Sequence, residues 1–189
     1  MEALQELSEK DIFAAGSDTS STTVEWAMSE MMRNPRVLEK AQIEIRQAFK
    51  GKKTIHEKDV KNLSYLKSVI KETLRLHPPA PLSVPRACRE LCEIDGYEIP
   101  VETNVIINAW AIGRDPGYWQ DAKRRRMCPR ILFGVANINL LLAQLLYQFD
   151  WKLQGGIEDL YMIEAIGAVA RKKNNLHLIP TSFSPPLAF

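Results

Sequence analysis

A cysteine follows a run of cations in the C-terminal third of the chain. Cys128 comes two residues after Arg126 and directly before Pro129, and an apolar stretch typical of a helix begins at Ile131. A helix dipole and nearby guanidinium groups both favour a thiolate over a thiol. A thiolate in this setting can act as a nucleophile or as a metal ligand. The same residues also fit a basic loop that leads into a core helix, with an incidental buried cysteine.

Hydrogen-bonding side chains fill the middle of a long helical pattern near the N-terminus. Every residue from 17 to 23 is Ser, Asp or Thr, and this run follows Gly16. Glycine lowers helix stability and these side chains compete for backbone groups, so we expect a kink or local widening. Asp18 and Thr19 then offer an acid and an alcohol for proton relay over a ligand. Equally, the small residues fit close packing of another helix.

Two further pairs of side chains could carry chemistry. Glu72 and Arg75 are three residues apart on an expected helix, so they share a face and can pair. From the spacing alone we expect an exposed pair of little energetic value. Cys88 and Cys92 are four residues apart with no second ligand pair nearby, which argues against a zinc site. We interpret both cysteines as strand-packing residues and expect no disulfide framework.

Helices and short strands must position these residues. Hydrophobic periodicity and proline breaks predict helices over 2–34, 35–49, 64–76 and 131–147, with one helical turn at 109–112. Asp95-Gly96 predicts a hairpin turn. We expect further short strands at 105–107, 151–153, 168–172 and 175–179, and a strand end followed by a short helix start over 54–59. The fold class is therefore mainly α with small β-sheets (α+β), in one domain.

Composition limits the classes of function. The chain has 189 residues, 46% hydrophobic and 25% charged, which suits one globular domain. A formal net charge of +2 predicts no general affinity for nucleic acid. No apolar stretch is long and uninterrupted enough to span a bilayer, and the N-terminus lacks a signal-peptide pattern.

Four motifs occur in an order that resembles the cytochrome P450 family. Ala15-Gly16-Ser17-Asp18-Thr19-Ser20 resembles the oxygen-activation motif of the family's central helix. Glu72-Thr73-Leu74-Arg75 resembles its E-x-x-R motif, and the stretch from Pro81 to Arg86 resembles the segment that follows. Arg126 and Cys128 resemble the haem-thiolate signature. The resemblance covers nearly the whole chain, and it is closest to plant microsomal members that oxidise terpenoids and alkaloids.

The resemblance implies haem b as the cofactor and assigns roles around it. Cys128 would be the axial thiolate ligand of the iron. Arg86 and Arg126 would pair with the haem propionates, since guanidinium suits carboxylate geometry. The remaining haem-site residues lie on the central helix: Ala15 and Gly16 would allow close approach to the haem, and Asp18 and Thr19 would deliver protons during oxygen activation.

The resemblance also implies a structural pair, a substrate and a partner. Glu72 and Arg75 would form a buried structural pair near the haem. The substrate would be a small apolar molecule, contacted by Ala14, Ala15, Leu82, Ser83, Val84 and the turn at 165–167 that includes Ile166. Electrons from NADPH would arrive through NADPH–cytochrome P450 reductase, at the cytosolic face of the endoplasmic reticulum membrane.

The sequence also departs from the family pattern. It begins at the central helix without the family's membrane anchor, so we expect residues 1–189 to form a partial domain and the chain to be cytosolic. Part of the family's meander is missing near 122–123. Asp121, Arg124 and Arg130 stand where a phenylalanine and two glycines are expected.

Two hypotheses follow from this resemblance and these departures. One is a haem-thiolate monooxygenase that hydroxylates an apolar plant metabolite such as a terpenoid. The other is an inactive P450 fragment without stable haem binding, which we favour for this polypeptide because a pocket wall and the ligand loop are altered.

Overall fold

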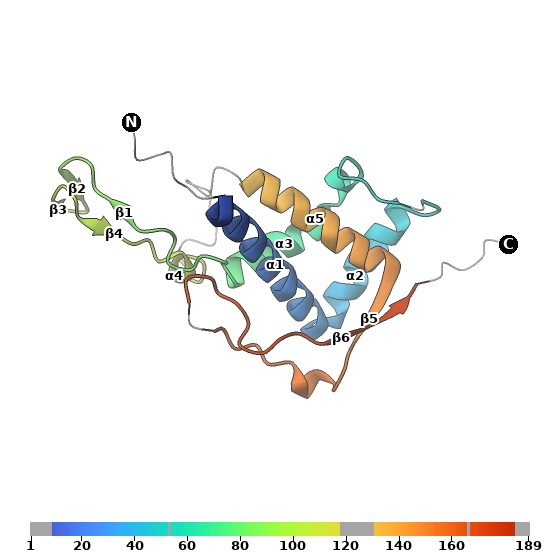
Figure 1. Ribbon diagram of the computed structural model, residues 1–189. Helices are drawn as coiled ribbons and strands as arrows, with labels where there is room; N and C mark the ends of the chain where they lie inside the picture. Colours follow the sequence, from blue (N-terminus) through green and yellow to red (C-terminus); the bar gives the residue numbers. More distant parts are fainter. Residues whose placement is uncertain (1–8, 53, 118–130, 166, 184–189) are drawn as a thin grey trace.

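The structure is a computed structural model that describes residues 9–52, 54–117, 131–165 and 167–183. The body consists of the long helices α1 (Glu9–Arg33), α2 (Pro35–Ala48), α3 (Ser64–Leu76) and α5 (Ile131–Gln148) (Figure 1). The shorter helices are α4 (Ala109–Ile112) and the 3-10 turns η1 (Asp59–Asn62) and η2 (Ile157–Asp159). The predicted helices and the mainly α class are confirmed over these ranges, and residues 2–8 lie outside the described part.

Helix α1 runs unbroken through its serine- and threonine-rich centre. The hydroxyl of Thr19 donates to the carbonyl of Ala15 at 2.7 Å, and that of Thr23 donates to Thr19 O at 2.7 Å. Side chains that bond back to the carbonyl four residues earlier leave the helical backbone bonds in place. The local widening that the sequence predicts is therefore wrong, since Glu9–Arg33 is α-helical throughout.

The core lies where the four long helices meet. Its fully buried apolar side chains come from all of them: Met31, Ile45, Leu66, Ile70, Leu142 and Leu146. A carboxylate on α2 fixes the start of α3, because Glu44 accepts hydrogen bonds from the backbone N–H groups of Tyr65 at 2.8 Å and Leu66 at 2.9 Å. These N–H groups have no partner within their own helix, so the contact sets α2 against α3.

The described strands form three antiparallel pairs. β1 (Arg86–Ala87) pairs with β4 (Asn104–Val105), and β2 (Cys92–Ile94) pairs with β3 (Tyr97–Ile99). These two pairs project away from the helical body as one arm (Figure 1). The third pair joins β5 (Phe149–Leu153) to β6 (Leu178–Ser182), which brings the end of the described chain back beside α5.

Three strand predictions are wrong. Ile55 enters the hydrophobic core at 4% exposure, and residues 54–55 form no strand. Within 168–172 there is one isolated bridge, between Glu164 and Lys172, because Ala170 bonds elsewhere: its N–H donates to Pro79 O at 3.0 Å and its carbonyl accepts from Trp26. The last strand begins at Leu178 instead of at 175. In the described ranges, no helix combines the length and the apolar character that crossing a membrane requires.

Candidate functional site

An open surface lies at Ala15 and Gly16 of α1 and at the first turn of α5. Ala15 and Gly16 are exposed, and a Cβ placed on Gly16 would meet no atom within 4 Å. Leu132 and Phe133, near the start of α5, are 79% and 69% exposed. The two helices pack against each other and begin at the same end of the body (Figure 1). The exposed backbone at Gly16 and the exposed apolar side chains of Leu132 and Phe133 thus lie on two helices that pack together.

The two residues predicted to deliver protons lie on the same turn of α1 but have separate partners. Asp18 forms an ion pair with Arg171, which comes from the C-terminal segment 153 residues away. Thr19 donates its hydroxyl hydrogen to Ala15 O, so the hydroxyl oxygen can still accept a hydrogen bond. The structure thus places an acid and an alcohol next to the open surface, with the acid held by a cation.

Glu72 and Arg75 form the pair that their spacing predicts. The Arg75 guanidinium contacts both carboxylate oxygens of Glu72 and donates through Nη1 to the carbonyl of Gly113 at 2.9 Å. The guanidinium lowers the pKa of Glu72 through these hydrogen bonds. The expectation of a buried pair is wrong for the acid, because the Glu72 side chain is 54% exposed. Arg75 is less exposed, at 21%, because its guanidinium reaches the carbonyl of Gly113.

The predicted substrate and propionate residues follow α3. Leu82 and Val84 are 52% and 72% exposed, and Ser83 between them has a φ of 57°. This alternation points apolar side chains outward from a tight turn. Arg86 is exposed at the start of β1 and forms no ion pair with any other described residue.

Several predicted site residues cannot be placed. Arg126, Cys128 and Ile166 lie outside the described residues. Ala14 belongs to α1, but its side chain is not described. The axial ligand, one propionate partner and two substrate contacts therefore stay predictions.

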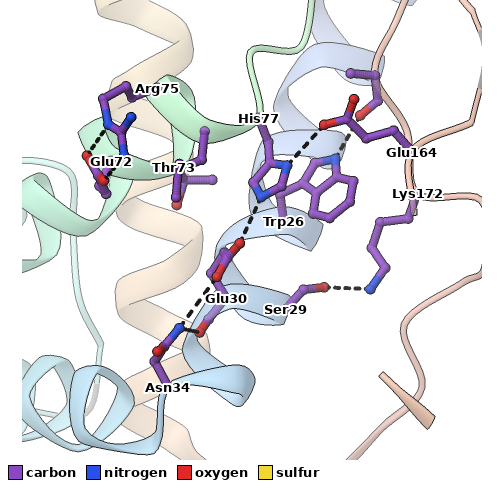
Figure 2. A network of polar contacts seen from close by, with 12 residues as sticks. Trp26, Ser29, Glu30, Asn34, Glu72, Thr73, Arg75, His77, Glu164 and Lys172 are labelled. Carbon is purple, nitrogen blue, oxygen red and sulfur yellow. Dashed lines mark hydrogen bonds and ion pairs between the residues drawn. The ribbon is translucent and has the colours of Figure 1, made fainter. Parts of the chain in front are cut away.

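A buried histidine that the sequence reasoning missed links three distant segments (Figure 2). His77, at the end of α3, has its Nε2 2.8 Å from Glu30 Oε1 on α1 and its Nδ1 3.2 Å from Glu164 Oε1. Its ring stacks on Trp26, whose Nε1 donates to Ala170 O at 2.7 Å. No local pattern could have revealed this, since the bonded partners lie 47 and 87 residues from His77.

A buried lysine completes this network. Lys172 is 7% exposed and donates through Nζ to Ser29 Oγ at 3.0 Å (Figure 2). Burial lowers the pKa of Lys172, and the carboxylates of Glu25 and Glu30 oppose that shift. The network packs the segment 164–172 against α1, and that segment also supplies Arg171 to Asp18. It therefore positions the candidate site without forming part of it.

The comparisons with known proteins identify the family. The cytochrome P450 family profile matches residues 6–124. The chain is 53% identical to premnaspirodiene oxygenase of Hyoscyamus muticus over 203 residues, which cover 93% of this chain and 40% of that protein. It is 55% identical to (+)-vincadifformine 19-hydroxylase of Catharanthus roseus, over 92% of this chain and 40% of that protein. The chain belongs to the cytochrome P450 family, and membership implies a haem cofactor.

The fold comparison agrees with this assignment. A solved structure of a zebra fish cytochrome P450 with abiraterone superposes with a TM-score of 0.80 at 21% identity, covering 92% of this chain and 46% of that one. The chain thus has part of the P450 fold and spans about two fifths of the length of the curated relatives above. The 203-residue alignment is longer than this 189-residue chain, so the relative has internal positions without a counterpart here.

Proposed function

We propose that the chain carries part of the catalytic domain of a plant haem-thiolate monooxygenase that hydroxylates a small apolar metabolite such as a terpenoid or an alkaloid. The observation that supports this most strongly is 53–55% identity, over at least 92% of the chain, to two plant oxygenases and a plant hydroxylase. The names of these relatives differ in substrate, so the proposal is limited to a class of substrate.

Exposed residues on α1 and α5 support a haem site beside Ala15 and Gly16. The exposed backbone at Ala15 and Gly16 and the side chains of Leu132 and Phe133 offer a face for an apolar macrocycle. Arg86 would hold a propionate, and Arg126 and Cys128 are proposed as the second propionate partner and the iron ligand. When bound, the haem would supply the iron at which oxygen is activated.

Proton delivery is proposed for Asp18 and Thr19. The Thr19 oxygen can accept a hydrogen bond while its hydroxyl donates to Ala15 O, and the partly exposed carboxyl group of Asp18 lies one residue away. Arg171 holds the Asp18 side chain in an ion pair, so Arg171 would have to move for Asp18 to change its partner.

Electrons are proposed to come from NADPH through NADPH–cytochrome P450 reductase, at the cytosolic face of the endoplasmic reticulum membrane. The similarity to plant family members supports this partner and this location. The exposed apolar residues Leu82 and Val84, with Ser83 between them, are proposed to contact the substrate together with Ala14 and Ile166.

A second candidate function is a P450-derived chain that does not hold haem stably. Two observations favour it. The alignments with relatives contain positions that this chain lacks, and the family match ends at residue 124, before Cys128. Arg124 and Arg130, where the family pattern has glycine, would also crowd a loop that passes close to a haem.

One spectrum distinguishes the two functions. The chain is expressed with haem, reduced with dithionite and exposed to carbon monoxide, and its absorption is recorded beside that of the Cys128→Ser variant. The monooxygenase assignment predicts a thiolate-type Soret band that the variant loses. If neither protein shows the Soret band, the result supports a chain that does not hold haem stably. A Soret band that survives in the Cys128→Ser variant would contradict Cys128 as the ligand.

A further inference from the structure

Two cysteines face each other on the arm formed by β1–β4 and β2–β3. The Sγ atoms of Cys88 and Cys92 are 3.5 Å apart, and Cys88 Sγ also lies 2.9 Å from the carbonyl oxygen of Glu90 between them. Cys92 is exposed and Cys88 is partly exposed. The interpretation of both cysteines as strand-packing residues is therefore wrong, since neither lies in the core.

Backbone pairing holds both thiols in place. Cys88 donates from its N–H to Thr103 O at 3.0 Å and accepts from Glu102 N–H at 2.8 Å. Cys92 lies in β2, opposite Ile99 of β3. Both ends of the connection between the cysteines are thus fixed by strands on the same arm. The fold of this arm thus holds the two sulfur atoms 3.5 Å apart.

We propose that Cys88 and Cys92 form a redox-active dithiol that hydrogen peroxide closes to an intramolecular disulfide. In the first step the sulfur of Cys92, the more exposed cysteine, attacks peroxide, breaks the O–O bond and becomes a sulfenic acid, with release of one water. In the second step Cys88 attacks that sulfur, the S–S bond forms, and a second water leaves. The two sulfurs lose two electrons in total, which reduce one peroxide molecule to two waters.

The surroundings of the pair predict a slow reaction. The neighbouring Cys88 thiol raises the pKa of Cys92 by sharing a hydrogen bond with it. Since the thiolate is the reactive form, little of Cys92 reacts at neutral pH, and closure needs excess peroxide. The disulfide would pin the loop 88–92 and stiffen the arm next to Val84 and Arg86. It does not depend on bound haem, so it can be tested independently of the proposed monooxygenase.

The test uses the full chain with Cys128→Ser, so that Cys88 and Cys92 are its thiols. Peroxide is titrated while free thiols are counted and the intact mass is recorded. We expect both thiols to disappear together, with loss of the mass of two hydrogen atoms and full recovery in dithiothreitol. Loss of one thiol at a time, addition of oxygen to the mass, or linkage between chains would overturn the proposal.

A second measurement checks proximity without oxidation. Phenylarsine oxide bridges two thiols that lie close together, so one equivalent should protect both cysteines of this protein from alkylation. The matched controls add Cys88→Ser or Cys92→Ser to the same Cys128→Ser chain. In each control, the protection of the remaining thiol from alkylation should fall at least tenfold. Equal protection of the single-thiol controls, or none in the dithiol protein, would contradict the pairing.

Discussion

The imidazole of His77 lies flat on the indole of Trp26, with ring centroids 3.9 Å apart and planes 1° from parallel. Both residues are at most 8% exposed, so the end of α3 is buried directly against α1. The stack leaves the two ring nitrogens of His77 at the edge, where Glu30 and Glu164 approach them. Burial of the ring and pairing of its nitrogens together fix three segments of the chain relative to one another.

Replacement of His77 by glutamine should destabilise the fold. The amide can satisfy one of the two carboxylates but loses the stack on Trp26, so we expect the free energy of unfolding to fall by about 1–3 kcal/mol. Urea denaturation followed by circular dichroism measures this. His56→Gln is the matched control, because His56 is exposed and should change stability little. Equal effects of the two substitutions would contradict a structural role for the stack.

The stability of the chain should depend on Glu30 in acid. The hydrogen bond from His77, aided by the positive charges of Arg33 and Lys172, lowers the pKa of Glu30 below its ordinary value of 4.5. The unfolded state then binds protons first, so the stabilisation is present above pH 4.5 and is lost as pH falls through the folded pKa. In the Glu30→Gln variant, the urea midpoint should change less with pH between about pH 5 and pH 3 than it does in the parent chain. An unchanged pH slope in this variant, compared with Glu39→Gln, would refute the assignment.

Two glycines should respond in opposite ways to alanine. A Cβ on Gly113 would lie 2.7 Å from the backbone oxygen of Arg75, so Gly113→Ala should cost about 1–3 kcal/mol. A Cβ on Gly16 meets nothing within 4 Å inside α1, so Gly16→Ala should stabilise the chain by about 0.5–1 kcal/mol. Thermal melts of both variants test this. The idea fails if Gly113→Ala melts at or above the parent temperature.

Removal of Arg75 should lower the stability of the fold more than removal of its partner Glu72. Arg75→Ala frees the carbonyl of the buried Gly113 as well as Glu72, so we expect a loss of about 1–3 kcal/mol. Glu72→Ala removes a mostly exposed carboxylate and should cost under about 1 kcal/mol. Urea midpoints of the two variants give the comparison. A larger loss for Glu72→Ala would mean that the acid, and not the contact with Gly113, makes the pair structural.

Local signals predicted the elements well. Pro35 marks the start of α2 because the first helical position needs no N–H donor, and the helix ends within one residue of the predicted end. Asp95 and Gly96 adopt φ values of 50° and 83°, which an Asp-Gly hairpin turn requires, and the hairpin is confirmed. The family resemblance is confirmed as well, because its motifs are short runs that can be read without the fold.

Contacts between distant segments could not be predicted. The spacing of Glu72 and Arg75 indicated their pairing, but the carbonyl of Gly113, 38 residues from Arg75, had no sequence signal. Likewise, Asp18 was predicted as a proton donor while its partner Arg171, 153 residues away, was not. Such pairs depend on how the helices pack against one another. The residue types and spacings of a single sequence do not indicate that packing.

The hydrogen bond from Trp26 to Ala170 has a consequence for the order in which the chain is made. The two residues are 144 positions apart, so a ribosome that adds about 5–20 residues per second completes α1 many seconds before Ala170 emerges. During that interval Trp26 lacks its acceptor, and His77 lacks Glu164. Residues 178–182 come later still, and β5 gains its partner only then. Trp26 therefore stays without this hydrogen bond during that interval, and chaperones that bind apolar segments have that period in which to act.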